Sequence, residues 1–294
     1  MSTNSCCSSD NSQPEQLHVA IIGSGSGAFA SAIKAAEGGA RVTIIEGADV
    51  IGGCCVNVGC VPSKILIRAA QLAHQQRTNP FDGLENIQPQ LSRSLLAHQQ
   101  NARVEELRDA KYQSILENNP ALSLLKGYAR FKNENTLLVQ KSDGSEEELV
   151  ADRILIATGS TPSIPPIDGL VDTPYWTSTE ALFSDVLPSS LVVIGSSVIA
   201  LEIAQAYARL GSSVTVLARH TLLYAEDPLL GEKLTECFEK EGIRVLNNTQ
   251  ANHVSYSNNG FSLETNEGTL TAEKLLISTG RHANTGKLGL ENVG

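Results

Sequence analysis

The chain has 294 residues and a formal net charge of −10, which leaves no basic surface large enough to hold a polyanionic nucleic acid. With 41% hydrophobic residues and 24 glycines it can form two cores of ordinary domain size. No apolar run reaches the ~18 residues of a membrane span, and the polar residues 1–16 do not resemble a secretion signal. We therefore expect a soluble, cytoplasmic protein that binds neither nucleic acid nor membrane.

The first half predicts a βαβ unit followed by helices and further strands. Residues 1–16, rich in Ser, Asn and Gln, are expected to be a disordered tail. A buried strand, a helix and a second strand are then predicted at residues 17–22, 28–37 and 41–45. Helical spacing follows at 62–76 and 91–117, and strand signals at 137–140 and 153–157.

The same order of elements begins again after a proline-rich connector, residues 161–169. Strand, helix and strand are predicted at 191–194, 199–210 and 213–217, and the Ile-Ala-Thr-Gly of 156–159 has a counterpart in the Ile-Ser-Thr-Gly of 277–280. The predicted fold is α/β, with two Rossmann-like dinucleotide-binding domains at 17–165 and 166–283 and a return toward the first at 284–294. Because no closing element follows the last apolar run, we expect a fragment.

The first predicted strand is followed by a glycine-rich turn that fits G-x-G-x-x-A. Gly23 allows a tight turn, Gly25 lets the backbone approach a pyrophosphate, and Ala28 permits close packing of helix on strand. Glu46 ends the next strand and can hold ribose hydroxyls. A glycine turn in another kind of α/β protein is the alternative, which the strand, helix and carboxylate together disfavour.

The second copy of this turn is weaker, because Ser197 stands where the second glycine belongs after Gly195. Its next strand is followed by Arg219, a cation at the place corresponding to Glu46. A carboxylate there would repel a ribose phosphate, whereas a guanidinium can bind one, so NADPH is the predicted second nucleotide. The alternative is a solvated surface arginine.

A cysteine segment, Gly52 to Lys64, carries the strongest signal, with Cys55 and Cys60 separated by four residues. On a regular helix their Cα atoms would be roughly 8 to 9 Å apart, beyond the ~7 Å that a disulfide tolerates. The segment therefore cannot be regular helix if they pair. Gly59 permits a distortion, Pro62 suits the first turn of a helix, and the helix start with Lys64 favours the Cys60 thiolate.

Inert buried cysteines or a zinc site are the alternatives for this segment. Zinc normally requires four ligands, and no second Cys/His pair lies at a suitable spacing. Cys237 is interpreted as a core residue of a helix at 231–241, and Cys6 and Cys7 belong to the expected tail, where a metal-gathering role is the less favoured interpretation.

Two dinucleotide folds with a C-x4-C segment resemble the pyridine nucleotide-disulfide oxidoreductases over residues 17–294. The amino-acid sequences of segments 65–70, 129–132, 174–182 and 194–202 are similar to those of the family members that reduce mercury(II). The resemblance implies that NADPH reduces FAD, that reduced FAD opens a Cys55–Cys60 disulfide, and that the thiolates hold Hg(II), delivered as a thiol complex, for reduction to Hg(0). Cys60 would lie against the flavin and Cys55 would meet the metal.

The resemblance also implies roles for individual residues. Lys64 and Glu202 would pair near the flavin, and Tyr112 matches an active-site tyrosine, although a tyrosine at a helix interface explains it nearly as well. Motif and resemblance together give a cofactor-binding set of Gly23, Ser24, Gly25, Ala28, Phe29, Glu46, Gly53, Cys54, Lys64, Ala129, Thr158 and Gly159 for FAD, and Gly195, Ser197, Ala200 and Arg219 for NADPH, with Glu202 also serving the NADPH side.

Several departures from the family pattern affect these expectations. Cys54 replaces the usual threonine, adding a third thiol, and we expect no metal-capture domain before residue 17. The chain ends before the family's flavin-binding aspartate, dimer interface and C-terminal cysteine pair, so we expect the whole protein to be a homodimer and this chain to bind FAD weakly. The rival interpretations are a reductase of organic disulfides and a thiol-rich metal-sequestering protein without flavin.

Overall fold

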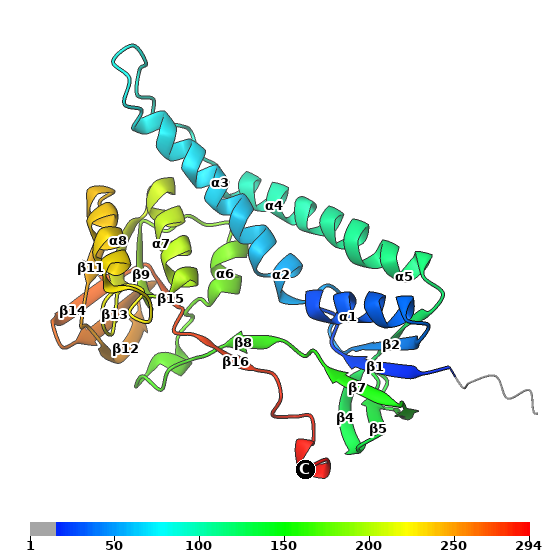
Figure 1. Ribbon diagram of the computed structural model, residues 1–294. Helices are drawn as coiled ribbons and strands as arrows, with labels where there is room; N and C mark the ends of the chain where they lie inside the picture. Colours follow the sequence, from blue (N-terminus) through cyan, green and yellow to red (C-terminus); the bar gives the residue numbers. More distant parts are fainter. Residues whose placement is uncertain (1–15) are drawn as a thin grey trace, which may run out of the picture. The chain divides into compact units, whose positions relative to one another are not determined.

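The computed structural model describes residues 16–294, which form two compact units (Figure 1). The first unit comprises 16–51, 114–158 and 285–294, and the second comprises 52–113 and 159–284. Within 16–294 no helix combines the length and apolarity needed to cross a membrane. The predicted tail lies outside the described residues except for Gln16, whose side chain donates a hydrogen bond to the Gly39 carbonyl at 3.0 Å.

The first unit is built on a parallel sheet of order β3-β2-β1-β7. Its strands are β1 (His18–Ile22), β2 (Arg41–Glu46), β3 (Leu122–Lys126) and β7 (Arg153–Ile156), with helices α1 (Ser26–Glu37) and α5 (Ser114–Asn118). An antiparallel sheet follows, formed by β4 (Tyr128–Asn133), β5 (Thr136–Gln140) and β6 (Glu146–Val150), and the 3₁₀ turn η3 (Leu290–Asn292) ends the chain. Apolar side chains of β1, β4 and β5 share one core, as expected for a parallel sheet covered on its faces.

The second unit repeats this plan on a parallel sheet of order β11-β10-β9-β15. Its strands are β9 (Ser190–Ile194), β10 (Ser213–Leu217), β11 (Arg244–Leu246) and β15 (Lys274–Ile277), with helices α6 (Ser178–Phe183), α7 (Val198–Leu210) and α8 (Pro228–Lys240). The antiparallel sheet is formed by β12 (Ala251–Ser257), β13 (Gly260–Thr265) and β14 (Gly268–Ala272). Strands β8 (Ser160–Pro162) and β16 (Arg281–Ala283) pair antiparallel, and η2 (Leu170–Asp172) is a short 3₁₀ turn.

Local sequence explains where the helices of the second unit begin. The Asp227 side chain accepts a hydrogen bond from Leu229 N at 2.9 Å, and Pro228 occupies the first turn of α8, where no N–H is needed. Helix α6 begins with a capping box, in which Thr177 and Glu180 satisfy each other's backbone donors. Helix α7 has a broad apolar face with Tyr207 fully buried, so it packs into the main core of this unit.

The cysteine segment and the helices after it also belong to the second unit. They are α2 (Gly53–Asn57), α3 (Cys60–Arg77), α4 (Arg93–Arg108) and a π-helical turn η1 (Asp109–Gln113). Leu66 and Ala70 of α3 are buried in the same core as α7 and β9. In chain order these helices lie between β2 and β3, the place that α8 occupies between β10 and β11 in the repeat.

The predicted α/β fold with two dinucleotide-binding units is confirmed, and so is the internal repeat. The predicted strand at 213–217 has the observed bounds, and the other named elements agree within a few residues. The helix predicted at 91–117 is wrong as one element, because it starts at Arg93 and a π turn divides it. The two compact units are defined by spatial contacts and include discontinuous segments, so they do not test the domain boundaries expected at 16/17, 165/166 and 283/284, which remain predictions.

Candidate functional site

The first glycine turn joins β1 to α1 in the first unit. Gly23 has φ +106°, and a Cβ there would lie 2.3 Å from the Ala157 carbonyl oxygen, so only glycine fits. Gly25 is the N-cap residue of α1 and has no side chain that could cap this helix end. Ala28 is fully buried, which lets the helix approach the strands. This arrangement presents a helix N-terminus at the end of a parallel strand, the geometry that favours a pyrophosphate.

Glu46 lies beside this turn, as the sequence predicted. Its carboxylate accepts hydrogen bonds from Ser24 N at 3.1 Å, from Ser24 Oγ at 2.5 Å and from Ala48 N at 2.7 Å. The carboxylate is thereby held at the carboxyl end of β2, where it can accept ribose hydroxyls. Of the other predicted residues in this unit, Phe29 and Ala129 are buried core residues. Thr158 lies two residues after β7 and is the last residue of the 114–158 segment of the unit.

The second glycine turn has the same construction in the second unit. Gly195 has φ +136°, and a Cβ there would lie 2.1 Å from the Ser278 carbonyl oxygen, the counterpart of Ala157. Ser197 is the N-cap residue of α7, its side chain makes no capping hydrogen bond among residues 16–294, and Ala200 is fully buried. Arg219 is exposed two residues beyond β10. The two turns thus share a backbone solution, and they differ in the charge of the residue that follows the next strand.

The cysteine segment is a helix broken in two. Cys54 and Cys55 lie in α2, the chain changes direction at Val58 and Gly59, and Cys60 is the first residue of α3. A Cβ on Gly59 would lie 2.9 Å from the Cys54 carbonyl oxygen, so glycine is needed for this close approach. The expectation that Cys55 and Cys60 do not share a regular helix is confirmed, and Pro62 stands in the first turn of α3. Gly53, another predicted residue, begins α2 with φ +65°.

Three thiols gather at the break, and none of the four described cysteines is in a disulfide. The hydrogen bond between Cys55 and Cys60 is the main cause that raises the pKa of the Cys55 thiol, and burial of Cys55 adds to it. Cys60 is exposed and Cys55 partly so. Within residues 16–294 no cluster of three or more His, Cys, Asp or Glu side chains could hold a metal ion. The pair itself offers two soft ligands at an accessible position.

Arg281 is a contact of this segment that the sequence interpretation missed. Its Nη2 donates to the Cys54 sulfur at 3.4 Å, its Nε donates to Ser160 Oγ at 2.9 Å, and Nη2 also bonds the Ser160 carbonyl. The residue follows the Thr-Gly pair of the second half, so the repeat could have singled it out. Cys54 therefore faces a guanidinium as well as the other thiols.

Lys64 and Glu202 form an ion pair between α3 and α7, as the resemblance implied. Their side chains are 61% and 31% exposed, so the pair stays within reach of solvent and ligand. They line a cavity of about 250 Å³ together with Ile67, Ala70, Gln205, Ala206 and Arg209. The cavity runs along the contact between the two helices.

Tyr112 lies in the π-helical turn, and only 8% of its surface is exposed. Its ring packs against Gly52, three residues before Cys55, since a Cβ on Gly52 would lie 3.1 Å from the ring. Such turns are frequent at functional sites, but the burial also fits a tyrosine at a helix interface. Both interpretations of Tyr112 stay open.

Two other cysteine interpretations can be compared with the structure. The interpretation of Cys237 as a core residue is wrong, because this thiol is exposed. Helix α8 buries Gly231 and Phe238, and Cys237 is directed about 100° away from Phe238 around the helix axis. Cys6 and Cys7 lie outside the described residues.

Comparison with known proteins gives concordant results. The family model described as pyridine nucleotide-disulphide oxidoreductase matches residues 17–294. The chain is 73% identical to a mercuric reductase of Shewanella putrefaciens over 297 residues, covering all of this chain and 53% of that protein. It is 55% identical to the mercuric reductase of Acidithiobacillus ferrooxidans, covering 97% of this chain and 52% of that one. The chain thus spans about half the length of these curated relatives.

A solved structure shows a similar fold. The Cu(II) complex of the HOCl-induced flavoprotein disulfide reductase RclA from Escherichia coli superposes with a TM-score of 0.83 at 29% sequence identity. The match covers 95% of this chain and 60% of that one.

Proposed function

Because the chain belongs to the pyridine nucleotide-disulphide oxidoreductase family, we propose that it is the nucleotide-binding and dithiol part of an NADPH-dependent enzyme that reduces Hg(II) to Hg(0). The observation that carries this proposal is the 73% identity with a mercuric reductase across the whole chain, which includes the cysteine segment. The whole protein would be a cytoplasmic homodimer that takes Hg(II) as a thiol complex.

The residues present fit two dinucleotides. In the first unit, the start of α1 at Gly25 and the fixed Glu46 carboxylate suit the pyrophosphate and a ribose of FAD. In the second unit, the uncapped start of α7 and the exposed Arg219 suit NADPH, whose extra phosphate a carboxylate would repel. When bound, the flavin would supply two-electron transfer from NADPH to the sulfur pair.

The cysteine pair would receive the metal by ligand exchange. The Cys55 and Cys60 thiolates displace two thiolate ligands from Hg(II), and the displaced ligands leave as free thiols. NADPH provides two electrons and one proton is consumed, so Hg(SR)₂, NADPH and H⁺ give Hg(0), NADP⁺ and two RSH. Thiolate is the ligand that a soft ion prefers, so the Cys55–Cys60 pair suits Hg(II).

Side chains around the pair would position it and carry charge. The Lys64–Glu202 ion pair joins the helix that begins at Cys60 to the helix that follows the second glycine turn. The hydrogen bond with Cys60 raises the pKa of the Cys55 thiol, so the two sulfurs act as one coupled pair. By the resemblance, Tyr112, whose ring packs against Gly52 just before α2, would contact a ligand on Cys55.

A reductase of organic disulfides is the second candidate, and the likeness to the disulfide reductase RclA favours it. Both candidates use the same cysteines and nucleotides, so they differ only in the final electron acceptor. A protein that sequesters metal without electron transfer would not need two nucleotide turns of this construction.

An anaerobic NADPH titration of the protein, followed by Hg(II) with excess thiol, tests the proposal. We expect flavin reduction, then NADPH oxidation that depends on Hg(II) and releases volatile mercury. Cys55→Ser and Cys60→Ser should lose that oxidation, whereas Cys237→Ser, at an exposed thiol in α8, should retain it. Inhibition by Hg(II) without mercury release, together with turnover of a disulfide, would replace this proposal with the second candidate.

A further inference from the structure

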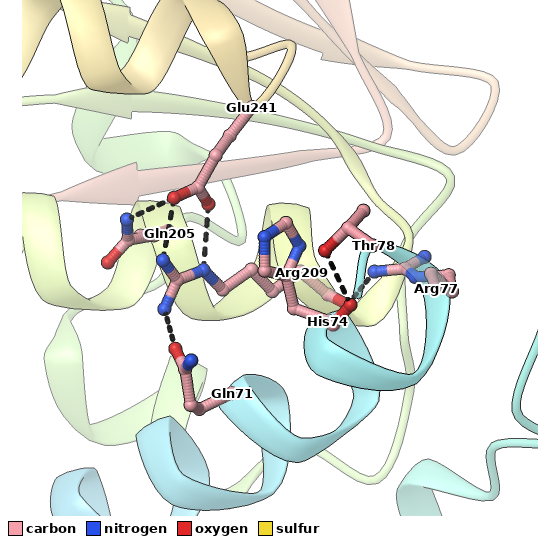
Figure 2. Close-up of polar contacts among 7 residues, drawn as sticks. All are labelled: Gln71, His74, Arg77, Thr78, Gln205, Arg209 and Glu241. Carbon is pink, nitrogen blue, oxygen red and sulfur yellow. Dashed lines mark hydrogen bonds and ion pairs between the residues drawn. The ribbon is translucent and has the colours of Figure 1, made fainter. Parts of the chain in front are cut away.

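A network of polar side chains joins α3, α7 and Glu241 at the C-terminal end of α8 (Figure 2), and its Gln205 and Arg209 also line the cavity described above. Arg209 donates from Nε to Glu241 Oε2 at 2.7 Å and from Nη2 to Glu241 Oε1 at 2.6 Å. Gln205 also donates to Glu241, at 3.0 Å. The third nitrogen of the guanidinium, Nη1, donates to Gln71 Oε1 of α3. We call these four residues the Arg209 cluster.

The Arg209–Glu241 pair of this cluster is less exposed than the other ion pairs among residues 16–294. Arg209 and Glu241 are 16% and 17% exposed, whereas Lys64 and Glu202 are 61% and 31% exposed. Burial opposes ionisation of Glu241, and the Arg209 hydrogen bond overcomes it and holds the pKa of that carboxyl below its usual value. The guanidinium is therefore fixed from the side of α8, with its remaining nitrogen directed at α3.

The two contacts between α3 and α7 set one register. Lys64 and Glu202 are 138 positions apart in sequence, and so are Gln71 and Arg209. The helices therefore run parallel and in step, and seven residues on each helix separate the two contacts, about 10.5 Å or two turns. Counting back along both helices, Cys60 at the start of α3 is level with Val198 at the start of α7.

Packing between the two contacts keeps the helices close, with Leu66 of α3 and Ile203 of α7 buried in the same core. Ala70, Ala204 and Ala206 are almost fully buried there, and small side chains let two helices approach without the interlocking that larger ones give. A third contact lies at the far end, where the Arg77 guanidinium donates to the Arg209 carbonyl. Directional bonds therefore add to the apolar packing a restraint on how far one helix can slide along the other.

We propose that Arg209, held by Glu241, is a positioning residue that sets the height of the cysteine helix α3 against the nucleotide helix α7 through Gln71. A fixed height keeps Lys64 opposite Glu202 and Cys60 level with the turn that ends at Ser197. The inference rests on the proposed function for its kinetic consequence, but its structural part concerns only the two helices.

Variants of Gln71 test this without removing a buried charge. Gln71→Met keeps the length and helix propensity of the side chain but removes the acceptor, whereas Gln71→Glu restores one. Gln75→Met, at an exposed glutamine of the same helix, is the matched control. The first readout is acylation of Lys64 by an amine-reactive ester, measured by mass spectrometry with exposed Lys240 as internal reference.

We expect Gln71→Met to raise the acylation rate of Lys64 about two- to five-fold, the range that an ion pair of this exposure can impose. Gln71→Glu and Gln75→Met should match the wild type. The second readout is NADPH-dependent turnover of the protein with Hg(II), in which Gln71→Met should lower kcat several-fold with little change in the KM for NADPH, since small displacements of reacting groups can cost up to ~100-fold.

An unchanged rate of Lys64 acylation in Gln71→Met would overturn the proposal, whether or not the melting temperature falls, because it would show that the cluster only stabilises the fold. Equal effects of Gln71→Met and Gln75→Met would overturn it as well. If the wild type oxidises no NADPH with Hg(II), the proposed function fails, and the acylation arm still decides the role of Arg209.

Discussion

Replacing Gly195 by alanine tests whether the second nucleotide turn depends on contact with a strand end of its own sheet. Gly195 has φ +136°, and an added Cβ would lie 2.1 Å from the Ser278 carbonyl oxygen, well inside the 3.0 Å that real Cβ contacts almost never go below. The carbonyl belongs to the chain that continues β15, so either the turn or the β9–β15 pairing must shift. Gly211 has φ +122° but nothing within 4 Å of an added Cβ.

The pair of glycines separates two energies. A side chain at positive φ destabilises the fold by about 1–2 kcal/mol, so both Gly195→Ala and Gly211→Ala should lower the free energy of unfolding by that amount. Forcing a methyl group into a filled space destabilises the fold by about a further 1–3 kcal/mol, and this applies only to Gly195→Ala. We therefore expect Gly195→Ala to lower the free energy of unfolding by about 2–5 kcal/mol and Gly211→Ala by about 1–2 kcal/mol.

Urea unfolding followed by tryptophan fluorescence measures this in the right part of the molecule. Trp176 is the single tryptophan, is 8% exposed and packs in the core of the second unit against Tyr207. NADPH affinity, measured by equilibrium dialysis, should fall in Gly195→Ala and stay unchanged in Gly211→Ala. Equal loss of stability in both variants would refute the argument, because it would assign the whole effect to backbone conformation.

Three further predictions concern single side chains. Since the Cys60 hydrogen bond is the main cause that raises the pKa of Cys55, Cys60→Ala should shift the pH profile of Cys55 alkylation by iodoacetamide to lower pH, and an unchanged profile would contradict this. Arg93 is 4% exposed, and its Nε and Nη1 lack hydrogen-bond partners among residues 16–294. Arg93→Met should therefore raise the free energy of unfolding, measured in urea, by roughly 1 kcal/mol, and a lower value than the wild type would argue against this. Arg219→Glu should weaken NADPH binding about ten-fold or more while sparing NADH, as dialysis against both nucleotides can show.

The nucleotide turns could be predicted from sequence because their chemistry is local. Gly23 and Gly195 each follow a buried strand and precede a helix, and the structure shows the same carbonyl contact at both. The weak match at Ser197 did not mislead, because the turn requires glycine at its first position, while Ser197 adopts extended backbone with φ −94°. The charged residues at or just after the end of the second strand of each unit, Glu46 and Arg219, could be identified from the sequence because they too are defined by local position.

Other features could not be predicted because they depend on distant partners. Helical spacing in 62–76 indicated one apolar face of α3, but it could not say that Leu66 and Ala70 bury that face in the core of α7. The π turn at Tyr112 interrupts a continuous helical pattern without a proline or glycine signal. Cys237 was predicted to be a core residue, but the buried face of α8 contains its neighbour Phe238 instead.

The position of the cysteine helix in the chain and its position in the structure imply different partners. By sequence it is an insertion after β2 of the first nucleotide fold, but by packing it belongs to the core that contains α7 and β9 of the second. Because buried side chains of α3 and α7 form one core, a change that loosens α7 must also loosen the helix that begins at Cys60. We therefore expect destabilising substitutions in the α7 core, such as Ala204→Gly, to increase hydrogen exchange along α3 as well as α7, whereas substitutions in β5 of the first unit, such as Val139→Ala, should leave α3 protected. Equal exchange of α3 in both variants would show that the helix is held independently of the second core.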